Sequence, residues 1–307
     1  MVYFKKLLRY IKVGAMNEEK NYRRNGEADF KMAIFRAKAG GRMKRFTHWH
    51  EEAEIHYQLK GHTDLQLGKD LYRVNEGEVY IIMPNEVHGV RGFSADAVTR
   101  SVVFHRDAIT MPEEHFFQKD FVKPLWEEKL VLPRCILQDH PSYGDFMLQF
   151  ELLDGCRIFE PNYKGKRLAL LMGICTAMLP YTKTVEGPQK LPDPGNETVK
   201  LCMRYLHSYY REKITLEKLA AHVHLHPNYL CALFKEHTGE RIFDYLTRVR
   251  VDTAAAILRR EDISVSKLAE QTGFPSESLF YQKFRQQMGM SPKAYRRAQE
   301  QNGDREE

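Results

Sequence analysis

The sequence predicts an α+β protein of two domains: a small antiparallel β-barrel with flanking helices, followed by an all-helical domain. Three observations support this prediction. Residues 30–104 consist of short runs rich in β-branched and aromatic residues, with turn residues between them. Residues 184–196 hold three prolines and two glycines without periodicity, which is typical of a linker. Residues 197–300 show the apolar spacing of helices and contain one small unit twice.

Length and composition narrow the class of protein. The chain has 307 residues, enough for two hydrophobic cores, and its 43% apolar and 29% charged residues are typical of globular domains. No apolar run reaches the ~18 residues of a membrane span, so no membrane partner is expected. The cysteines are scattered without CxxC spacing, which predicts reduced thiols in the cytoplasm. They are Cys135, Cys156, Cys175, Cys202 and Cys231.

The domain boundaries follow from the shifts in composition. They are a lead-in at 1–29, the barrel with its helices at 30–183, the linker at 184–196, the helical domain at 197–300 and a polar tail at 301–307. The basic, mildly amphipathic stretch before Met16 has apolar runs too short for a signal peptide. It is expected to be a short lead-in, or the true start is Met16.

Six runs in the first domain have the composition of strands: 32–37, 53–61, 63–68, 72–74, 78–84 and 99–104. Their regular spacing without intervening helices predicts the small antiparallel barrel. Two helical segments follow, 145–159 and 163–182. The second has a broad apolar face, which either packs on the barrel or forms the seam of a homodimer, and the spacing leaves both open.

Four polar side chains are expected to converge inside the barrel. His48 and His50 are two residues apart, so on a strand they face the same side, and Glu54 keeps that parity. His88 arrives from a later strand. Three imidazoles and one carboxylate suit a divalent metal such as Zn, Fe, Mn or Ni. In the alternative, the four side chains bond strand ends or face a small polar effector.

The helical domain contains a repeat, 214–239 and 263–289. Apolar, basic and glycine positions recur at an offset of 49 or 50 residues, and a fixed offset of this kind indicates a structural repeat. The matching positions are Leu219-Ala220 with Leu268-Ala269, Leu225 with Phe274, Leu230 with Phe280, Phe234 with Phe284, Lys235 with Arg285, and Gly239 with Gly289.

Each copy carries the start and stop signals of two helices joined by a tight turn. In the first copy, Thr215 is an N-cap, Pro227 suits the start of the second helix, and Gly239 suits its C-terminal left-handed position. The second copy places Ser264, Gly273, Ser276 and Gly289 in the corresponding roles. Two such units predict a double helix-turn-helix, whose second helices can lie in a DNA major groove.

Two further helices complete the predicted domain. A leading helix presents Val199, Met203, Leu206 and Tyr210 on one face, and a long helix at 241–260 joins the two units. A continuous helix fixes the separation of the two recognition helices, as reading two adjacent grooves ~34 Å apart requires. Residues 197–300 carry 17 Lys+Arg against 12 Asp+Glu, so DNA affinity is expected to depend strongly on salt.

The first domain resembles the cupin family. The resemblance rests on His48-Trp49-His50, Glu54 and Gly61, and then on Gly77, Pro84 and His88. Two glycines depart from the family pattern: Gly41 is displaced by one residue, and Glu86 stands where a glycine is expected. All four metal-ligand positions of the family are filled, so the resemblance implies a metal or effector site at those residues.

The second domain resembles the DNA-binding domain of AraC/XylS transcription regulators. The matching residues are Leu219-Ala220, Tyr229-Leu230, Leu233-Phe234-Lys235, Thr238-Gly239, Tyr245-Leu246, Arg250, Ala254 to Leu258, Ile263, Leu268-Ala269, Gly273-Phe274, Phe284-Arg285, Gly289, Ser291-Pro292 and Tyr295-Arg296. The family's base-reading positions fall on Asn228, Tyr229, Cys231, Ala232 and Lys235, and on Ser276, Glu277, Ser278, Leu279, Tyr281, Gln282 and Arg285.

The chemistry of these positions refines the expectation. Asn228 and Gln282 suit bidentate contacts to adenine, and Glu277 can accept from cytosine. Lys235 and Arg285 suit phosphates. Tyr229 is either a contact or a packing residue. Many relatives have Arg at the position of Ala232, so the first unit is expected to make few groove contacts.

The resemblance implies a sequence-specific transcription regulator, an activator, with a cupin-like sensor for a sugar or related metabolite. Its implied partners are promoter DNA, the effector, RNA polymerase and a second copy of the chain. The alternative is a metal-dependent cupin enzyme carried to DNA, but no separate acid–base pair or nucleophile pattern supports turnover. An architectural DNA binder is disfavoured because the first domain is too large to be idle.

Overall fold

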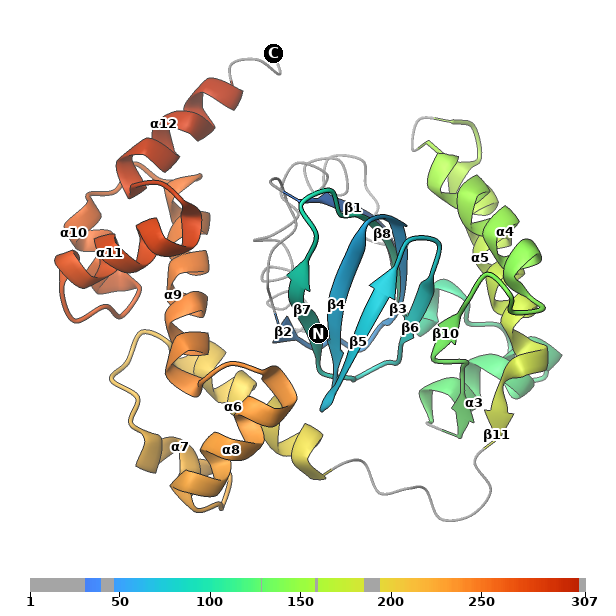
Figure 1. Ribbon diagram of the computed structural model, residues 1–307, viewed down its shortest axis with the longest axis horizontal. Helices are drawn as coiled ribbons and strands as arrows, with labels where there is room; N and C mark the ends of the chain where they lie inside the picture. The colour runs from blue at the N-terminus through green and yellow to red at the C-terminus, as the bar shows by residue number, and fades with distance from the viewer. Residues whose placement is uncertain (1–30, 40–46, 128, 158–159, 185–193, 304–307) are drawn as a thin grey trace. The chain divides into compact units, whose positions relative to one another are not determined.

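The computed structural model describes residues 31–39, 47–127, 129–157, 160–184 and 194–303 (Figure 1). The chain forms two compact units that divide between Asp193 and Pro194. The predicted lead-in at 1–29 lies outside the described residues, as does most of the predicted linker. Within the described part of the chain, no helix has the length and apolar character needed to cross a membrane.

Two antiparallel sheets form the first unit. The larger has the order β1 (Met32–Lys38), β8 (Val98–Phe104), β3 (Ala53–Lys60), β6 (Val79–Ile82) and β10 (Cys135–Ile136). The smaller has the order β2 (Thr47–His48), β7 (His88–Phe93), β4 (His62–Leu67) and β5 (Asp70–Asn75). Every pairing between these strands is antiparallel.

The predicted antiparallel, β-rich first domain is confirmed, but the residues that the structure describes do not form a closed barrel. Their strands form two separate hydrogen-bonded sheets rather than one continuous ring. The two sheets meet through a small apolar cluster, in which Leu65, Leu67 and Val74 of the smaller sheet pack with Tyr80 and Ile82 of the larger. The domain is therefore a pair of antiparallel sheets packed face to face.

Helices cover the outer face of the larger sheet. The segment after β8 contains η2 (Arg106–Ala108), η3 (Gln118–Val122), α3 (Lys123–Trp126) and β9 (Leu130–Val131). After β10 come α4 (Tyr143–Gly155), α5 (Tyr163–Met178), η4 (Leu179–Tyr181) and β11 (Lys183–Thr184), which pairs with β9.

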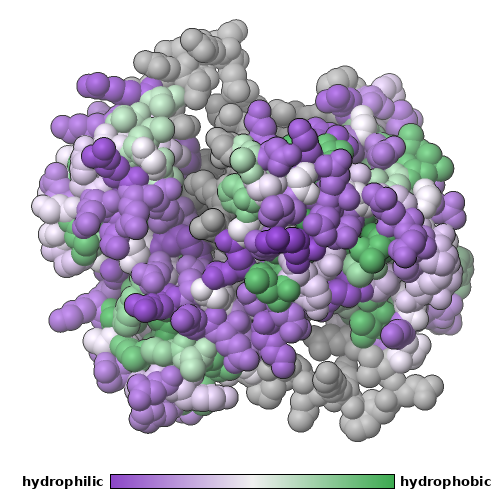
Figure 2. Space-filling view, in the orientation of Figure 1, coloured by the Kyte–Doolittle hydropathy of each residue, from purple (hydrophilic) through white to green (hydrophobic). Residues whose placement is uncertain are grey.

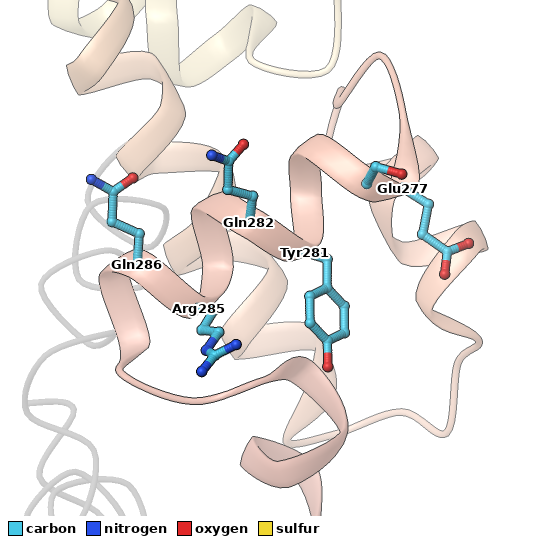
Figure 3. A pocket seen from close by; sticks show the side chains of 6 residues that line it. Glu277, Tyr281, Gln282, Arg285 and Gln286 are labelled. Carbon is cyan, nitrogen blue, oxygen red and sulfur yellow. The ribbon is translucent and has the colours of Figure 1, made fainter.

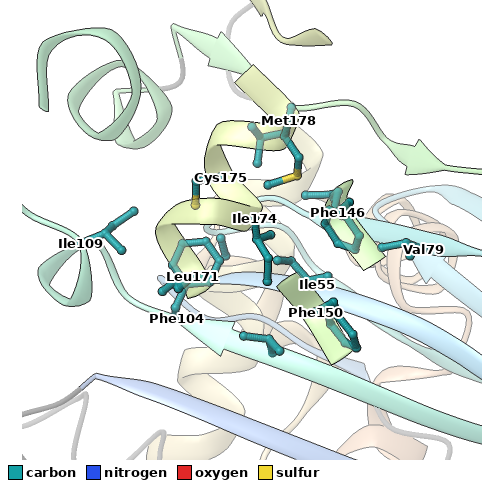
Figure 4. Packing of buried hydrophobic residues seen from close by; sticks show 14 of the residues in the cluster. Ile55, Val79, Phe104, Ile109, Phe146, Phe150, Leu171, Ile174, Cys175 and Met178 are labelled. Carbon is teal, nitrogen blue, oxygen red and sulfur yellow. The ribbon is translucent and has the colours of Figure 1, made fainter. Parts of the chain in front are cut away.

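The apolar face of α5 packs inward. Figure 4 shows Leu171, Ile174, Cys175 and Met178 of α5 beside Phe146 and Phe150 of α4 and Ile55, Val79 and Phe104 of the sheet. All four of these α5 side chains are fully buried. The helix therefore packs on the sheet, which was the first of the two predicted alternatives. Burial of Cys175 also raises the pKa of its thiol, as expected for a packing cysteine.

The second unit is all-helical. Its helices are α6 (Pro194–Tyr209), α7 (Leu216–His222), α8 (Pro227–Thr238), α9 (Ile242–Leu258), α10 (Val265–Gln271), α11 (Glu277–Met288) and α12 (Pro292–Gly303). Helix α6 begins inside the predicted linker, at Pro194. Helix α9 is continuous and joins the two helix-turn-helix units, α7–α8 and α10–α11.

The predicted helix signals of both units are confirmed. The hydroxyls of Thr215, Ser264 and Ser276 each accept a backbone N–H three residues along, at 3.2–3.3 Å. Gly239 and Gly289 end their helices at φ of 65° and 74°. One start signal was missed, because the Nδ1 of His226 accepts from the N–H of Asn228 and caps α8.

Gly273 occupies the turn between α10 and α11 at φ +79°, which favours glycine. A Cβ there would lie 2.5 Å from the Tyr210 carbonyl oxygen and 2.8 Å from Arg211 Cα. Backbone atoms cannot move aside as a flexible side chain can. The turn therefore packs directly on the chain that follows α6.

This packing predicts a difference between two glycines of the same unit. Gly289 has φ +74° but nothing within 4 Å of its Cβ position. Gly289→Ala should destabilise the protein by about 1 kcal/mol, since only the left-handed conformation is disfavoured. Gly273→Ala should destabilise the protein by roughly 1–3 kcal/mol more than Gly289→Ala, because its methyl group would also clash with backbone atoms. Urea unfolding of both variants tests this, and equal losses would contradict it.

Candidate metal centre and DNA-binding helices

The four predicted cluster residues come from strands β2, β3 and β7 and from the connection after β2. His48 ends β2 and pairs directly with His88, the first residue of β7. His50 lies in the connection beyond β2, and Glu54 lies on β3. The predicted convergence is confirmed, but its predicted basis was wrong: His48 and His50 do not share a strand, because β2 ends at His48. The turn after β2 brings His50 back beside the pair.

The four side chains form a compact cluster. One candidate ligand atom from each of the four residues lies within 4.8 Å of the others. The ring centroids of His48 and His88 are 4.3 Å apart, and those of His50 and His88 are 4.7 Å apart. His50 and His88 are buried, with relative exposures of 1% and 2%. Three imidazoles and a carboxylate in this space form one potential binding centre.

Hydrogen bonds orient two of the imidazoles. His50 Nδ1 lies 3.0 Å from the carbonyl oxygen of Glu52, and His88 Nδ1 lies 2.8 Å from that of Glu86. A carbonyl only accepts, so each Nδ1 carries the proton. The Nε2 atoms then face Glu54 Oε2, at 3.3 Å from His50 and 3.6 Å from His88.

The electrostatics of the cluster couple His50 to Glu54. Burial of Glu54 would raise the pKa of its carboxyl, but the hydrogen bond from His50 and the nearby charges of His50 and His88 hold that pKa well below 4.5. Burial of His50 would lower its pKa, but the hydrogen bond and charge of Glu54, together with Glu52, raise it above 6.5. In the metal-free protein, charge and the contact between His50 Nε2 and Glu54 Oε2 therefore hold the two side chains together.

The donor set fits a divalent ion. His88 Nε2 is buried and makes no hydrogen bond to the described residues, which is the situation of a nitrogen that a metal would satisfy. The Nδ1–H bonds to backbone carbonyls are the support that metal-binding histidines normally have. His48, His50 and His88 through nitrogen and Glu54 through oxygen would be the ligands.

Sequence reasoning missed a polar face that continues from this cluster along β3. Glu54, His56 and Gln58 alternate with Ile55 and Tyr57, which belong to the core beneath the helices. His56 pairs with Tyr80 and Ser101 across the sheet, and its Nδ1 lies 3.3 Å from the Ser101 hydroxyl. The alternation in AEIHYQLK was a usable signal, because the polar positions are the ones that face the opposite sheet.

Three buried polar atoms stand out on the inner side of this unit. His56 Nε2, Gln58 Oε1 and Thr63 Oγ1 have no hydrogen-bond partner among the described residues. Buried polar groups are normally paired, and an unpaired one costs about 1–3 kcal/mol. Burial also lowers the pKa of His56, so its ring is neutral and can both donate and accept. These atoms are therefore free to hydrogen-bond a small polar molecule that reaches them.

In the second unit, the predicted base-reading residues lie on α8 and α11 and are largely exposed. Those on α8 are all exposed, including Tyr229 at 57%, which favours the contact role of Tyr229 over the packing role. On α11, Leu279 is only partly exposed and packs against the core of its unit. It is the one predicted contact that the structure assigns mainly to packing.

Helix α11 presents a hollow surface with polar residues around it. Figure 3 shows Glu277, Tyr281, Gln282, Arg285 and Gln286 projecting from this helix, and together with Ser278 they line the hollow. Gln286 was missed in the sequence analysis. Its place four residues after Gln282 was the available signal, since such residues share a helix face.

Comparison with known proteins agrees with both halves of this description. Residues 219–298 match the family model of a helix-turn-helix domain, and residues 33–101 match that of a cupin domain. The two domains define a DNA-binding transcription regulator with an N-terminal cupin domain. The chain thus combines an AraC-type helix-turn-helix domain with a cupin domain, and its relatives are AraC-family transcription regulators.

Three relatives illustrate the similarity. Regulatory protein PocR of Salmonella typhimurium is 33% identical over 37% of this chain and 36% of PocR. The HTH-type transcriptional regulator YdeC of Bacillus subtilis is 23% identical over 81% of this chain and 85% of YdeC. The melibiose operon regulatory protein of Escherichia coli is 31% identical over 34% of each chain. The matches to PocR and the melibiose regulator thus span about a third of those proteins.

The coupled pKa values predict a window of pH for the metal-free protein. The lowered pKa of Glu54 stabilises the fold above pH 4.5 and that contribution is lost as pH falls, whereas the raised pKa of His50 stabilises below pH 6.5 and is lost as pH rises. The stability difference between wild type and Glu54→Gln should therefore be greatest between these values. Chemical denaturation with a chelator present measures it, and a difference independent of pH would contradict the coupling.

Proposed function

We propose that this regulator binds promoter DNA with α8 and α11 and that a small polar effector in the cupin domain controls this binding. The observation that carries the proposal is the pair of matched helices, each with exposed polar side chains and both attached to one continuous helix, α9. Such an arrangement suits two adjacent major grooves on one side of the duplex. Activation through contact with RNA polymerase in the cytoplasm is part of this proposal.

The two recognition helices are proposed to contribute unequally. Helix α11 offers Gln282 for adenine, Glu277 for cytosine and Arg285 for phosphate, and Gln286 extends the same face. Helix α8 offers Asn228 and Lys235, but Cys231 and Ala232 provide only apolar contact, for example to a thymine methyl. Sequence preference should therefore be stronger in the half of the site that α11 contacts.

In the cupin domain, we infer that His48, His50, Glu54 and His88 hold a divalent metal. The buried Nε2 of His88 and the 3.3 Å approach of His50 Nε2 to Glu54 Oε2 support this inference. The ion would supply a Lewis-acidic anchor for oxygen atoms of the effector. The named relatives are transcription regulators, which favours ligand sensing over catalysis at this site.

The polar interior supports a sugar or related metabolite as the effector. His56, Gln58 and Thr63 offer buried hydrogen-bonding atoms that hydroxyl groups can satisfy. The name of the melibiose operon relative is consistent with this class of molecule. Control of DNA binding requires that the effector has different affinities for two arrangements of the protein.

A second copy of the chain is a further proposed partner. Leu148 and Leu152 lie one turn apart on α4 and are 57% and 53% exposed, whereas the rest of the apolar face of α4 is buried. Figure 2 shows hydrophobic patches over the region of α4 and α5 within an otherwise mostly hydrophilic face. Since α5 packs inward, α4 rather than α5 would provide the dimer seam.

Footprinting tests the DNA proposal with a matched pair of variants. Gln282→Ala removes the proposed adenine contact, whereas Gln271→Ala removes the same type of side chain from α10 outside α11. Gln282→Ala should weaken binding to the regulator's promoter by roughly 1–3 kcal/mol and relax preference at one position. Gln271→Ala should leave the footprint unchanged. Equal effects of the two changes, or no protection at low salt, would refute the proposal.

Calorimetric titration with Zn²⁺, Ni²⁺ and Mn²⁺ tests the metal proposal. Wild type should bind one ion per chain, and His88→Ala should abolish tight binding because it removes a ligand. His62→Ala serves as the control, since His62 lies on β4 outside the cluster. Wild-type protein that binds none of these ions would leave the cluster as a purely hydrogen-bonding part of the effector site.

A further inference from the structure

The orientation of His50 and His88 depends on two backbone carbonyls. Glu52 O accepts from His50 Nδ1, and Glu86 O accepts from His88 Nδ1. If either carbonyl moved away, the Nδ1–H group would lose its hydrogen bond. The ring could then adopt the other tautomer, in which Nε2 is protonated and cannot bind a metal. The turns that carry these carbonyls therefore determine whether the cluster can act as a ligand set.

Arg134 holds the turn before His88. Its guanidinium forms a bidentate pair with the Glu86 carboxylate, Nη1 to Oε2 at 2.7 Å and Nη2 to Oε1 at 2.9 Å. Arg134 is itself fixed to β6, since its carbonyl accepts from the N–H of Ile81 at 2.9 Å and its Nη1 donates to the Ile81 carbonyl at 3.2 Å. A planar guanidinium fixes the direction of a carboxylate as well as its distance.

Two further hydrogen bonds hold the turn in place, in addition to the ion pair between Arg134 and Glu86. Glu86 Oε2 also accepts from the N–H of Met83 at 3.2 Å. Asn85 takes the left-handed conformation, with φ of 65°, and its N–H donates to the His50 carbonyl at 2.8 Å. The turn before His88 and the turn at His50 are thus bonded to each other, so a displacement of one is felt by the other.

Trp126 holds the second turn from another side. At the end of α3, its indole N–H donates to the carbonyl of Glu51 at 3.1 Å, next to the Glu52 carbonyl that binds His50. The Trp126 ring also packs on Phe104, with ring centroids 6.1 Å apart. Phe104 is fully buried and pairs with Ala53, so the contact rests on the rigid part of the sheet.

We propose that Arg134 and Trp126 are positioning residues for the His/Glu cluster: they keep His88 and His50 in the tautomer that leaves Nε2 available to a ligand. The proposal rests on the proposed binding function of the cluster and adds residues outside it. Glu86, the residue that departs from the cupin pattern, is explained by its role as the partner of Arg134. An ion pair placed only for stability would not need to end on the residue whose carbonyl orients His88.

The test uses the full-length protein labelled with ¹⁵N-histidine, without metal and then titrated with Zn²⁺. The variants are Arg134→Met, Arg134→Lys, which keeps the charge but loses the fork, and Trp126→Phe, which keeps a ring but loses the N–H. The control is Arg73→Met, since Arg73 forms an ordinary exposed ion pair with Asp64 on the smaller sheet. Long-range ¹H–¹⁵N spectra report the tautomer of His88, assigned with His88→Gln.

In wild type and Arg73→Met, His88 should be protonated on Nδ1. Arg134→Met should give a mixture of tautomers and Zn²⁺ affinity lower by about 10- to 100-fold, with an intermediate loss for Arg134→Lys. Trp126→Phe should weaken Zn²⁺ binding by about tenfold. If Arg134→Met does not fold, the two conservative variants decide the question by the same measurements.

Two results would overturn the proposal: variants that keep the wild-type tautomer and Zn²⁺ affinity, or wild-type His88 protonated on Nε2. Failure of the metal proposal would be separate from either. Wild-type protein that binds no Zn²⁺ would still support positioning if the Nδ1–H tautomer of His88 is present in wild type and lost in Arg134→Met.

Discussion

Both helix-turn-helix units depend on the burial of one helix, α9. Its first half packs in the first unit, where the rings of Tyr245 and Phe234 lie 5.5 Å apart. Its second half packs in the second unit, where Ala254 and Leu258 share a core with Phe284. A helix rises about 1.5 Å per residue, so Tyr245 and Leu258 are separated by roughly 20 Å along a rigid rod. The spacing of α8 and α11 is therefore a property of one element rather than of a flexible connection.

The sequence predicted this helical unit nearly in full, because its signals are local. A cap, a turn glycine and an apolar stripe each act within about one helical turn, and the repeat presents each signal twice. The misses are residues whose type is unusual for their role. His226 caps α8 with an imidazole, and His224 adopts φ of 55° at the place where the second unit has Gly273. Leu279 packs against the core although the predicted contact residues Ser278 and Tyr281 beside it are exposed.

The cupin unit was less predictable, because its decisive contacts join distant parts of the chain. The four cluster residues were found from a strand parity that β2 is too short to provide, and the turn at His50 replaces it. The partner of Glu86 is Arg134, 48 residues away, and no spacing rule connects the two. β9, β10 and β11 have two residues each, too few for any periodicity to show. Closure into a barrel likewise depends on long-range pairing that composition does not report.

One arrangement relates the cluster to the end of its domain. Trp126 and Arg134 flank β9 in the sequence, and β9 pairs with β11, where Lys183 lies opposite Val131. β11 is the last described element before Pro194, where the DNA-binding unit begins. Residues 126–134, which orient the imidazoles, therefore also include the strand that pairs with β11. A ligand that displaces His88 or His50 would also displace the backbone at Glu86 or Glu52, to which these rings are hydrogen-bonded. That displacement would reach Arg134 and Trp126, which lie on either side of β9 in the sequence. The ligand changes DNA binding only if its affinity differs between two arrangements of the β9–β11 pair. A ligand that binds both arrangements equally does not shift the equilibrium between them.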